Sequence, residues 1–100
     1  MARFEVIVHP AALDEAGAAA AWYRERSSDA ASAFLDEIER AIAAIQQGPE
    51  RWPSCGRSAH RFLMSKFPFA VGYRIRGMTV EVLAIAHGHR RPGYWRGRTA

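Results

Sequence analysis

Hydrophobic and polar residues alternate in four short segments of the chain, and this period of two predicts four β-strands. The segments are residues 3–8, 59–65, 69–75 and 79–87. The turn at residues 76–78 is short and contains glycine, as tight hairpin turns commonly do. The last three strands are therefore expected to follow one another as a meander, while a long helical region separates them from the first strand.

Two segments between the first and second strands repeat hydrophobic residues with the period of an α-helix. The first helix is expected over residues 10–26, with proline in its first turn and two acids, Asp14 and Glu15, near its positive end. The second helix follows the capping residues 27–29 and ends at the Gly-Pro pair of residues 48–49. Its apolar face consists of Phe34, Ile38, Ala41, Ile42 and Ile45, and its polar face of Asp36, Glu37, Glu39 and Arg40. The short turn between the helices predicts an antiparallel hairpin.

The resulting order, β-α-α-β-β-β, predicts an α+β fold. A helical hairpin should pack on one face of a small, mainly antiparallel sheet. The chain has 100 residues, which suits a single domain. We therefore expect one domain over residues 1–100, made of a strand (1–8), a helical hairpin (10–47), a three-stranded meander (59–87) and a basic tail (88–100).

Charge is distributed unevenly along the chain. Residues 1–50 contain four arginines and nine acids, whereas residues 51–100 contain nine arginines and Lys66 against Glu81 alone. Arginine makes forked contacts with phosphate and carboxylate groups. We therefore expect the second half to have a basic, exposed sheet face and to bind an anionic partner, which could be nucleic acid, a phosphate-rich assembly or an acidic protein segment.

The cysteine content and the apolar runs limit the possible locations. The single cysteine, Cys55, cannot form a disulfide within the chain, which favours a reducing compartment. The first residues do not have the pattern of a signal peptide. The longest apolar run, residues 16–23, is far shorter than the ~20 residues of a membrane helix. We expect a cytoplasmic protein without a membrane partner.

Two stretches of the second half resemble the ParE/RelE superfamily of toxins from type II toxin–antitoxin systems. Residues 67–75 (FPFAVGYRI) resemble the central strand of that family, and residues 80–95 (VEVLAIAHGHRRPGYW) resemble its last strand and tail. The early Pro10, the alanine-rich first helix and the Gly-Pro pair at 48–49 also match. The resemblance implies a toxin that is neutralised by an antitoxin.

The same resemblance implies the partners. The antitoxin is expected to bind through an acidic amphipathic C-terminal segment that folds as it binds. Operator DNA is expected to be contacted only through the antitoxin, and no cofactor is expected. The residues expected to contact the antitoxin are Arg61, Leu63, Lys66 and Trp22.

The superfamily contains two mechanisms. RelE-like members cleave mRNA on the ribosome, and the residues that could do so here are Arg61, His87, Arg90 and Tyr94. ParE-like members inhibit DNA gyrase by binding it. This chain has Ala70 where RelE-like nucleases have an arginine, and losing one charge-stabilising group commonly costs ~100–1,000-fold in rate. The sequence thus favours a non-catalytic gyrase inhibitor, with the mRNA endoribonuclease and a plain nucleic-acid-binding module as alternatives. The residues expected to contact the target are Arg74, Arg90, Arg91, Tyr94 and Trp95.

Several of these residues have a second, structural interpretation. Arg74 is as well placed to pair with Glu81 across the hairpin as to contact a target. His87 and His89, with His60 or Cys55, form only a weak metal-binding signal, so we predict no metal site and a strand-end histidine bonded to the backbone. Among the tryptophans, Trp22 is expected to pack within the helical hairpin, Trp52 to cover one edge of the core, and Trp95 to face a partner.

Overall fold

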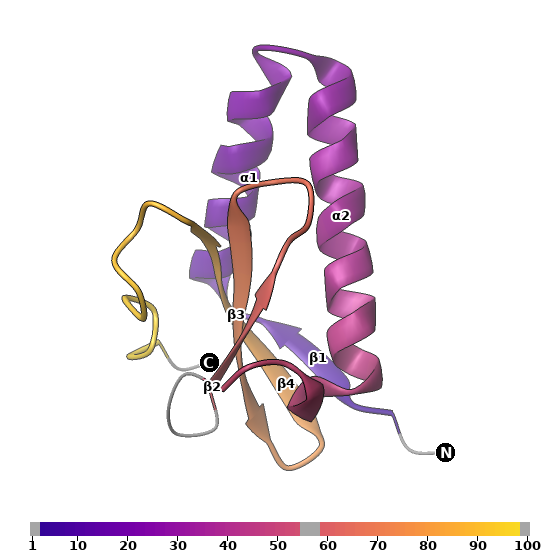
Figure 1. Cartoon of the computed structure of the whole chain (residues 1–100), viewed down its shortest axis with the longest axis vertical. Coiled ribbons are helices and arrows are strands. Elements are labelled where there is room, and N and C mark those ends of the chain that lie inside the picture. The colour runs from indigo at the N-terminus through magenta and orange to yellow at the C-terminus, as the bar shows by residue number, and fades with distance from the viewer. Residues whose placement is uncertain (1–2, 55–58, 99–100) are drawn as a thin grey trace.

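The computed structural model describes residues 3–54 and 59–98. Its helices and strands follow the predicted β-α-α-β-β-β order, with one short 3-10 helix added after the second α-helix. In chain order the elements are β1 (Glu5–Val8), α1 (Pro10–Arg24), α2 (Ser28–Gln47), η1 (Pro49–Arg51), β2 (Ala59–Leu63), β3 (Phe69–Arg76) and β4 (Thr79–His87) (Figure 1).

The four strands form one mixed sheet in the order β1-β4-β3-β2. The meander of β2, β3 and β4 is antiparallel, and β1 pairs parallel with β4, Val6 lying opposite Val80 and Val8 opposite Val82. The helical hairpin connects β1 to the rest of the sheet and covers one of its faces (Figure 1). The predicted α+β fold with a mainly antiparallel sheet is confirmed.

Local hydrogen bonds set the ends of the helices. The ring of His9 accepts a hydrogen bond from the amide of Ala11 at 3.0 Å. Pro10 is the first residue of α1, and because proline has no N–H, it leaves no unpaired donor in the first turn. The hydroxyl of Ser27 accepts from the amide of Ala30 at 3.2 Å and caps α2, as the sequence predicts. The first helix ends at Arg24, two residues earlier than expected.

The main core lies between the helical hairpin and the sheet. From α2 it takes Phe34, Ile38 and Ile45, all buried. In the sheet Tyr73 is fully buried, and its hydroxyl donates to the carbonyl of Pro49 at 2.5 Å. Trp52 packs edge-on against Phe62 with the ring centres 4.6 Å apart, which confirms its place at one edge of the core. The alanines of α1 let this helix approach the sheet closely, since Ala12, Ala19 and Ala20 are its buried residues.

The polar face of α2 contains one buried acid, Glu37. Its carboxylate accepts hydrogen bonds from the amide of Ser65 at 3.1 Å and from its hydroxyl at 2.8 Å. The hydroxyl of Ser65 is the main cause of a lowered pKa of the Glu37 carboxyl, and the amide adds to the effect. This contact fastens the loop between β2 and β3 to the helical hairpin.

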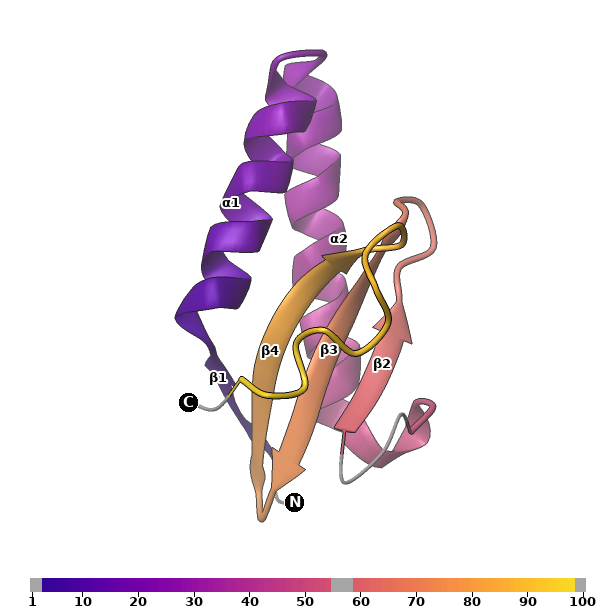
Figure 2. The same ribbon diagram turned by 90° about the vertical axis from the view of Figure 1, so that its left-hand side faces the viewer.

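The other face of the sheet is covered by the tail, residues 88–98, which turns back across β4 and β3 (Figure 2). Trp95 is only 2% exposed and packs with Leu83, Ala84 and Ala59. Gly72 makes this possible, because a Cβ atom at that position would lie 2.4 Å from the Trp95 ring. The expectation of a basic, exposed sheet face is therefore wrong, because a tryptophan from the tail packs on small residues of this face and covers it.

Neither α-helix in the described residues combines the length and the apolar character that crossing a bilayer requires.

Candidate functional site

The strand β4 is longer than its neighbour β1, and this leaves part of its edge open. Pairing with β1 ends at Val82, whose carbonyl accepts from the amide of His9 at 2.8 Å. Beyond that point two side chains form the hydrogen bonds to the β4 backbone that a neighbouring strand would otherwise form. The carboxylate of Glu15, on α1, accepts from the amide of Ile85 at 3.0 Å, and the guanidinium of Arg98, in the tail, donates to the carbonyl of Leu83 at 2.9 Å.

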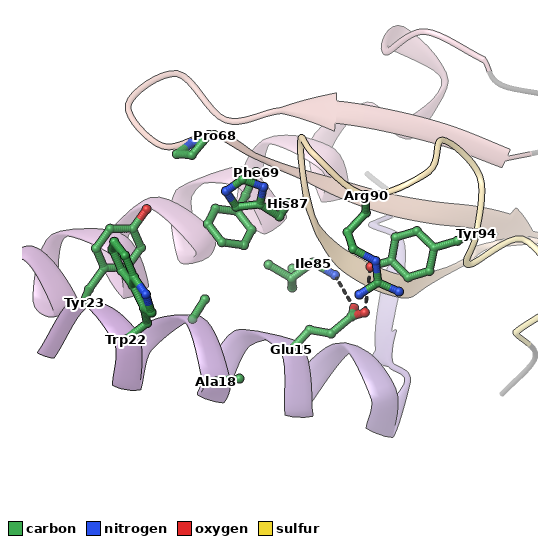
Figure 3. Close-up of a pocket in the computed structure, with 11 residues that line it drawn as sticks. Glu15, Ala18, Trp22, Tyr23, Pro68, Phe69, Ile85, His87, Arg90 and Tyr94 are labelled. Atoms are coloured by element: carbon green, nitrogen blue, oxygen red, sulfur yellow. Dashed lines mark hydrogen bonds between the residues drawn. The ribbon is translucent and has the colours of Figure 1, made fainter. Parts of the chain in front are cut away.

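Glu15 is the centre of a polar cluster that joins α1, β4 and the tail (Figure 3). Its two oxygens accept from the two terminal nitrogens of Arg98, each at 3.0 Å, which is the forked geometry that arginine and carboxylate prefer. The hydroxyl of Tyr94 donates to Glu15 at 2.7 Å. The guanidinium of Arg90 lies over the Tyr94 ring, 3.9 Å from its centre. We call Glu15, Tyr94 and Arg98 the tail clasp.

The clasp fixes the protonation states of its members. Burial alone would raise the pKa of the Glu15 carboxyl, but the hydrogen bonds from Arg98, Tyr94 and the Ile85 amide together lower it below its usual value. Burial, followed by the hydrogen bond to Glu15, raises the pKa of Tyr94 to about 12. At neutral pH Glu15 is therefore ionised, and Tyr94 keeps its proton and donates it.

An apolar groove of about 480 Å³ extends from the clasp along α1 (Figure 3). One wall is formed by α1, the other by the end of the sheet, and the lining residues outside the clasp are Ala18, Ala19, Trp22, Tyr23, Pro68, Phe69, Ile85, His87 and Arg90. Trp22 is 52% exposed at its rim, with the guanidinium of Arg26 stacked 3.6 Å from the ring centre. The expected burial of Trp22 in the hairpin is wrong, because the buried residues of α1 are Ala12, Ala19 and Ala20 and Trp22 lies outside that buried stripe.

A second groove, of about 350 Å³, lies between the tail and β2. Four arginines line it, namely Arg61, Arg90, Arg91 and Arg96. None of the described residues in its lining is Asp or Glu. Within residues 3–54 and 59–98, no carboxylate forms an ion pair with any of the four. We call this the basic groove.

The other arginines of the second half that the structure pairs lie elsewhere. Arg74 donates to Glu81 through Nε at 2.9 Å, and Arg76 lies 3.4 Å from the same carboxylate. The predicted cross-hairpin pair of Arg74 and Glu81 is confirmed. Arg74 is thereby paired within the sheet, and this favours the structural interpretation of Arg74 over a contact with a target.

The remaining predicted residues fall into three places. Leu63, 66% exposed, Arg61 and Lys66 are all exposed on β2 and in the loop after it. His87 ends β4 and accepts from the amide of His89 at 3.0 Å, which confirms the backbone-bonded interpretation. Trp95 is buried between the tail and the sheet and cannot contact a target in this conformation, contrary to expectation.

Metal binding finds no support in the part of the chain that the structure describes, which contains no group of three His, Cys, Asp or Glu side chains arranged to hold an ion. His60 instead bonds through Nδ1 to the carbonyl of Trp52 at 2.8 Å. The remaining candidate ligand, Cys55, lies outside the described residues.

Sequence reasoning missed Glu15 and Arg98. In the sequence, Glu15 has the ordinary interpretation of an acid near the positive end of a helix. A signal was nevertheless present, because Glu15 is three residues after Ala12 and four before Ala19, and so lies on the same stripe as these two buried alanines. An acid on a buried stripe indicates a partner from another element, but the sequence does not say which.

A comparison with protein families finds that the model of the ParE toxin of type II toxin–antitoxin systems, parDE, matches residues 6–92. The chain belongs to the ParE toxin family. The resemblance to the ParE/RelE superfamily is thereby confirmed, and the chain is a ParE toxin of a type II toxin–antitoxin system. The matched range of this ParE toxin ends before Tyr94, Trp95 and Arg98, so two of the three clasp residues, Tyr94 and Arg98, lie outside it, whereas Glu15 lies within it.

Solved structures agree with this assignment at the level of the fold. The ParE toxin is similar to a chain in the structure described as the chromosomal ParDE TA system from P. aeruginosa, with a TM-score of 0.73 and 18% identity. The alignment covers 84% of this chain and 95% of that one. No curated protein sequence matches the chain.

Proposed function

We propose that this ParE toxin inhibits DNA gyrase by binding it, without nuclease chemistry, and that a cognate antitoxin neutralises it. The observation that best supports a non-catalytic toxin is the hydrogen bond that the Tyr94 hydroxyl donates to the carboxylate of Glu15 at 2.7 Å.

The nuclease alternative needs a base for the 2′-hydroxyl and an acid for the leaving oxygen, each with a pKa near the working pH. Tyr94 is a poor candidate for either role, because its pKa is raised to about 12 and its proton is directed at a carboxylate. Ala70, where a nuclease would have a cation, is buried, and Arg74 on the same strand is paired with Glu81. These contacts favour a surface that binds over one that transfers protons.

The antitoxin is proposed to use an acidic amphipathic C-terminal segment. The apolar groove beside the exposed Trp22 offers it a hydrophobic surface, and Arg61, Leu63 and Lys66 offer charge and an apolar contact along the outer strand β2. An amphipathic segment with acids on one face complements both features. Operator DNA is proposed to be reached only through this antitoxin.

Two assays on the purified toxin, run in parallel, test the target. The first measures gyrase supercoiling of relaxed plasmid, and the second measures cleavage of ribosome-bound mRNA. We expect loss of supercoiling with intact message, and addition of the antitoxin should restore supercoiling. A toxin that leaves gyrase active but cuts the message would overturn the proposal in favour of the RelE-like alternative.

A further inference from the structure

The basic groove concentrates positive charge that the fold does not neutralise. Arg61 reaches it from β2, whereas Arg90, Arg91 and Arg96 reach it from the tail. Acids neutralise other arginines of this chain, as Glu15 does for Arg98 and Glu81 for Arg74. The four groove arginines have no such partner among the described residues. Their mutual repulsion within one groove would be relieved by a bound polyanion.

The groove is also held in shape before any partner arrives. Its tail wall is anchored on one side by Trp95, which is 2% exposed over Gly72, and on the other by the clasp at Glu15. Arg90 is further restrained by its position over the Tyr94 ring. Because the backbone of the tail and the side chain of Arg90 are already positioned, less conformational entropy remains to be lost on binding, and this favours affinity.

We infer that the basic groove binds the phosphates of a DNA backbone, so that the toxin contacts the DNA held by its target as well as the target protein. The choice of DNA rests on the proposed function, because gyrase works on DNA. The groove suits a linear polyanion in particular, because cations from both β2 and the tail line it, and guanidinium groups fork onto phosphate oxygens. An acidic protein segment is the competing occupant.

The test compares two double variants with the same change in net charge. Arg61→Gln with Arg91→Gln removes one cation from each wall of the groove. Arg24→Gln with Arg51→Gln removes two exposed cations outside it. Binding of a labelled 20-base-pair DNA duplex is measured by fluorescence anisotropy over a range of salt concentrations, and binding of a polyglutamate peptide is measured beside it.

The logarithm of the DNA-binding constant falls linearly with the logarithm of the salt concentration, and each phosphate contact makes this slope steeper by about 0.9. Near 0.1 M salt, each contact raises the affinity by about 8-fold. The groove variant should therefore lose about 10- to 100-fold in duplex affinity and about 2 in slope, while the control stays close to wild type. It should also inhibit gyrase less than the control does.

Three results would count against these ideas separately. A groove variant with the affinity and slope of the wild type overturns the groove inference. So does a wild-type toxin that binds polyglutamate more tightly than the duplex and loses that binding in the groove variant, since Arg61 and the groove then serve the acidic antitoxin segment proposed above and not DNA. A wild-type toxin that leaves gyrase untouched refutes the proposed target, whereas the groove itself is still decided by the duplex titration alone.

Discussion

Replacing Glu15 by alanine should destabilise the toxin more than any other change of a single acid outside the sheet. The substitution removes the acceptor of the Ile85 amide, of the Tyr94 hydroxyl and of both terminal nitrogens of Arg98. A buried donor left without an acceptor costs about 1–3 kcal/mol, and hydrogen bonds to charged groups contribute about 1.5–3 kcal/mol each.

The full sum of these terms is an overestimate. The side chain of Arg98 is 22% exposed, so it recovers part of its hydration when Glu15 is lost. Tyr94 is likewise only half-buried. We therefore expect a loss of about 2–4 kcal/mol in the free energy of unfolding, dominated by the Ile85 amide and the Arg98 fork. For 100 residues this corresponds to a fall in Tm of about 10–20 °C.

Urea denaturation followed by far-UV circular dichroism measures this loss. Glu39→Ala is the matched control, because Glu39 is an exposed acid on α2 and its replacement should change stability by less than about 0.5 kcal/mol. Glu15→Gln should fall between the two, since it keeps acceptor oxygen but not charge. If Glu15→Ala unfolds at the same urea concentration as the control, the clasp does not hold the tail and the reasoning is wrong.

Three further predictions concern the same region. Gly72→Ala should lower stability by about 1–3 kcal/mol, because its Cβ would overlap the Trp95 ring, whereas Gly17→Ala, which meets nothing within 4 Å, should raise it by up to about 1 kcal/mol; thermal melts of both variants decide this. The lowered pKa of Glu15 means that its contribution is complete above the unfolded value near 4.5 and is lost as the pH falls through the folded pKa, so urea midpoints of wild type and Glu15→Gln should converge on going from pH 7 to pH 3. Tyr94→Phe should cost about 1–2 kcal/mol by urea denaturation yet leave the tail in place and gyrase inhibition within about 3-fold; a folded variant that loses cleavage of ribosome-bound mRNA shown by the wild type would favour nuclease chemistry.

The order of elements could be predicted because it depends on local patterns. The alternation in residues 69–75, the apolar stripe of α2 and the cap at Ser27 each act within a few residues, and each has the predicted result. The tail could not be predicted in the same way. Residues 88–98 have no hydrophobic period, and they are held by contacts with distant parts of the chain: Trp95 packs over Gly72, and Tyr94 and Arg98 bind Glu15, more than seventy residues away.

The two tryptophans show why composition misleads at the site. Trp22 lies among alanines and was expected to be buried, and Trp95 lies among arginines and was expected to be exposed, but the structure has the opposite. Burial depends on the shape of the opposite surface. The absence of a side chain at Gly72 creates the space that Trp95 fills, whereas α1 faces the sheet through Ala12, Ala19 and Ala20 and Trp22 lies outside that stripe.

The short β1 has a consequence for how copies of the toxin behave toward one another. An open strand edge offers unpaired backbone groups to any other chain, and proteins commonly protect such edges with charged side chains. Glu15 and Arg98 occupy the open edge of β4 at Ile85 and Leu83, so a strand from a second molecule would have to displace an ion pair before it could join the sheet. The contacts that fasten the tail therefore also guard a basic toxin against edge-to-edge aggregation.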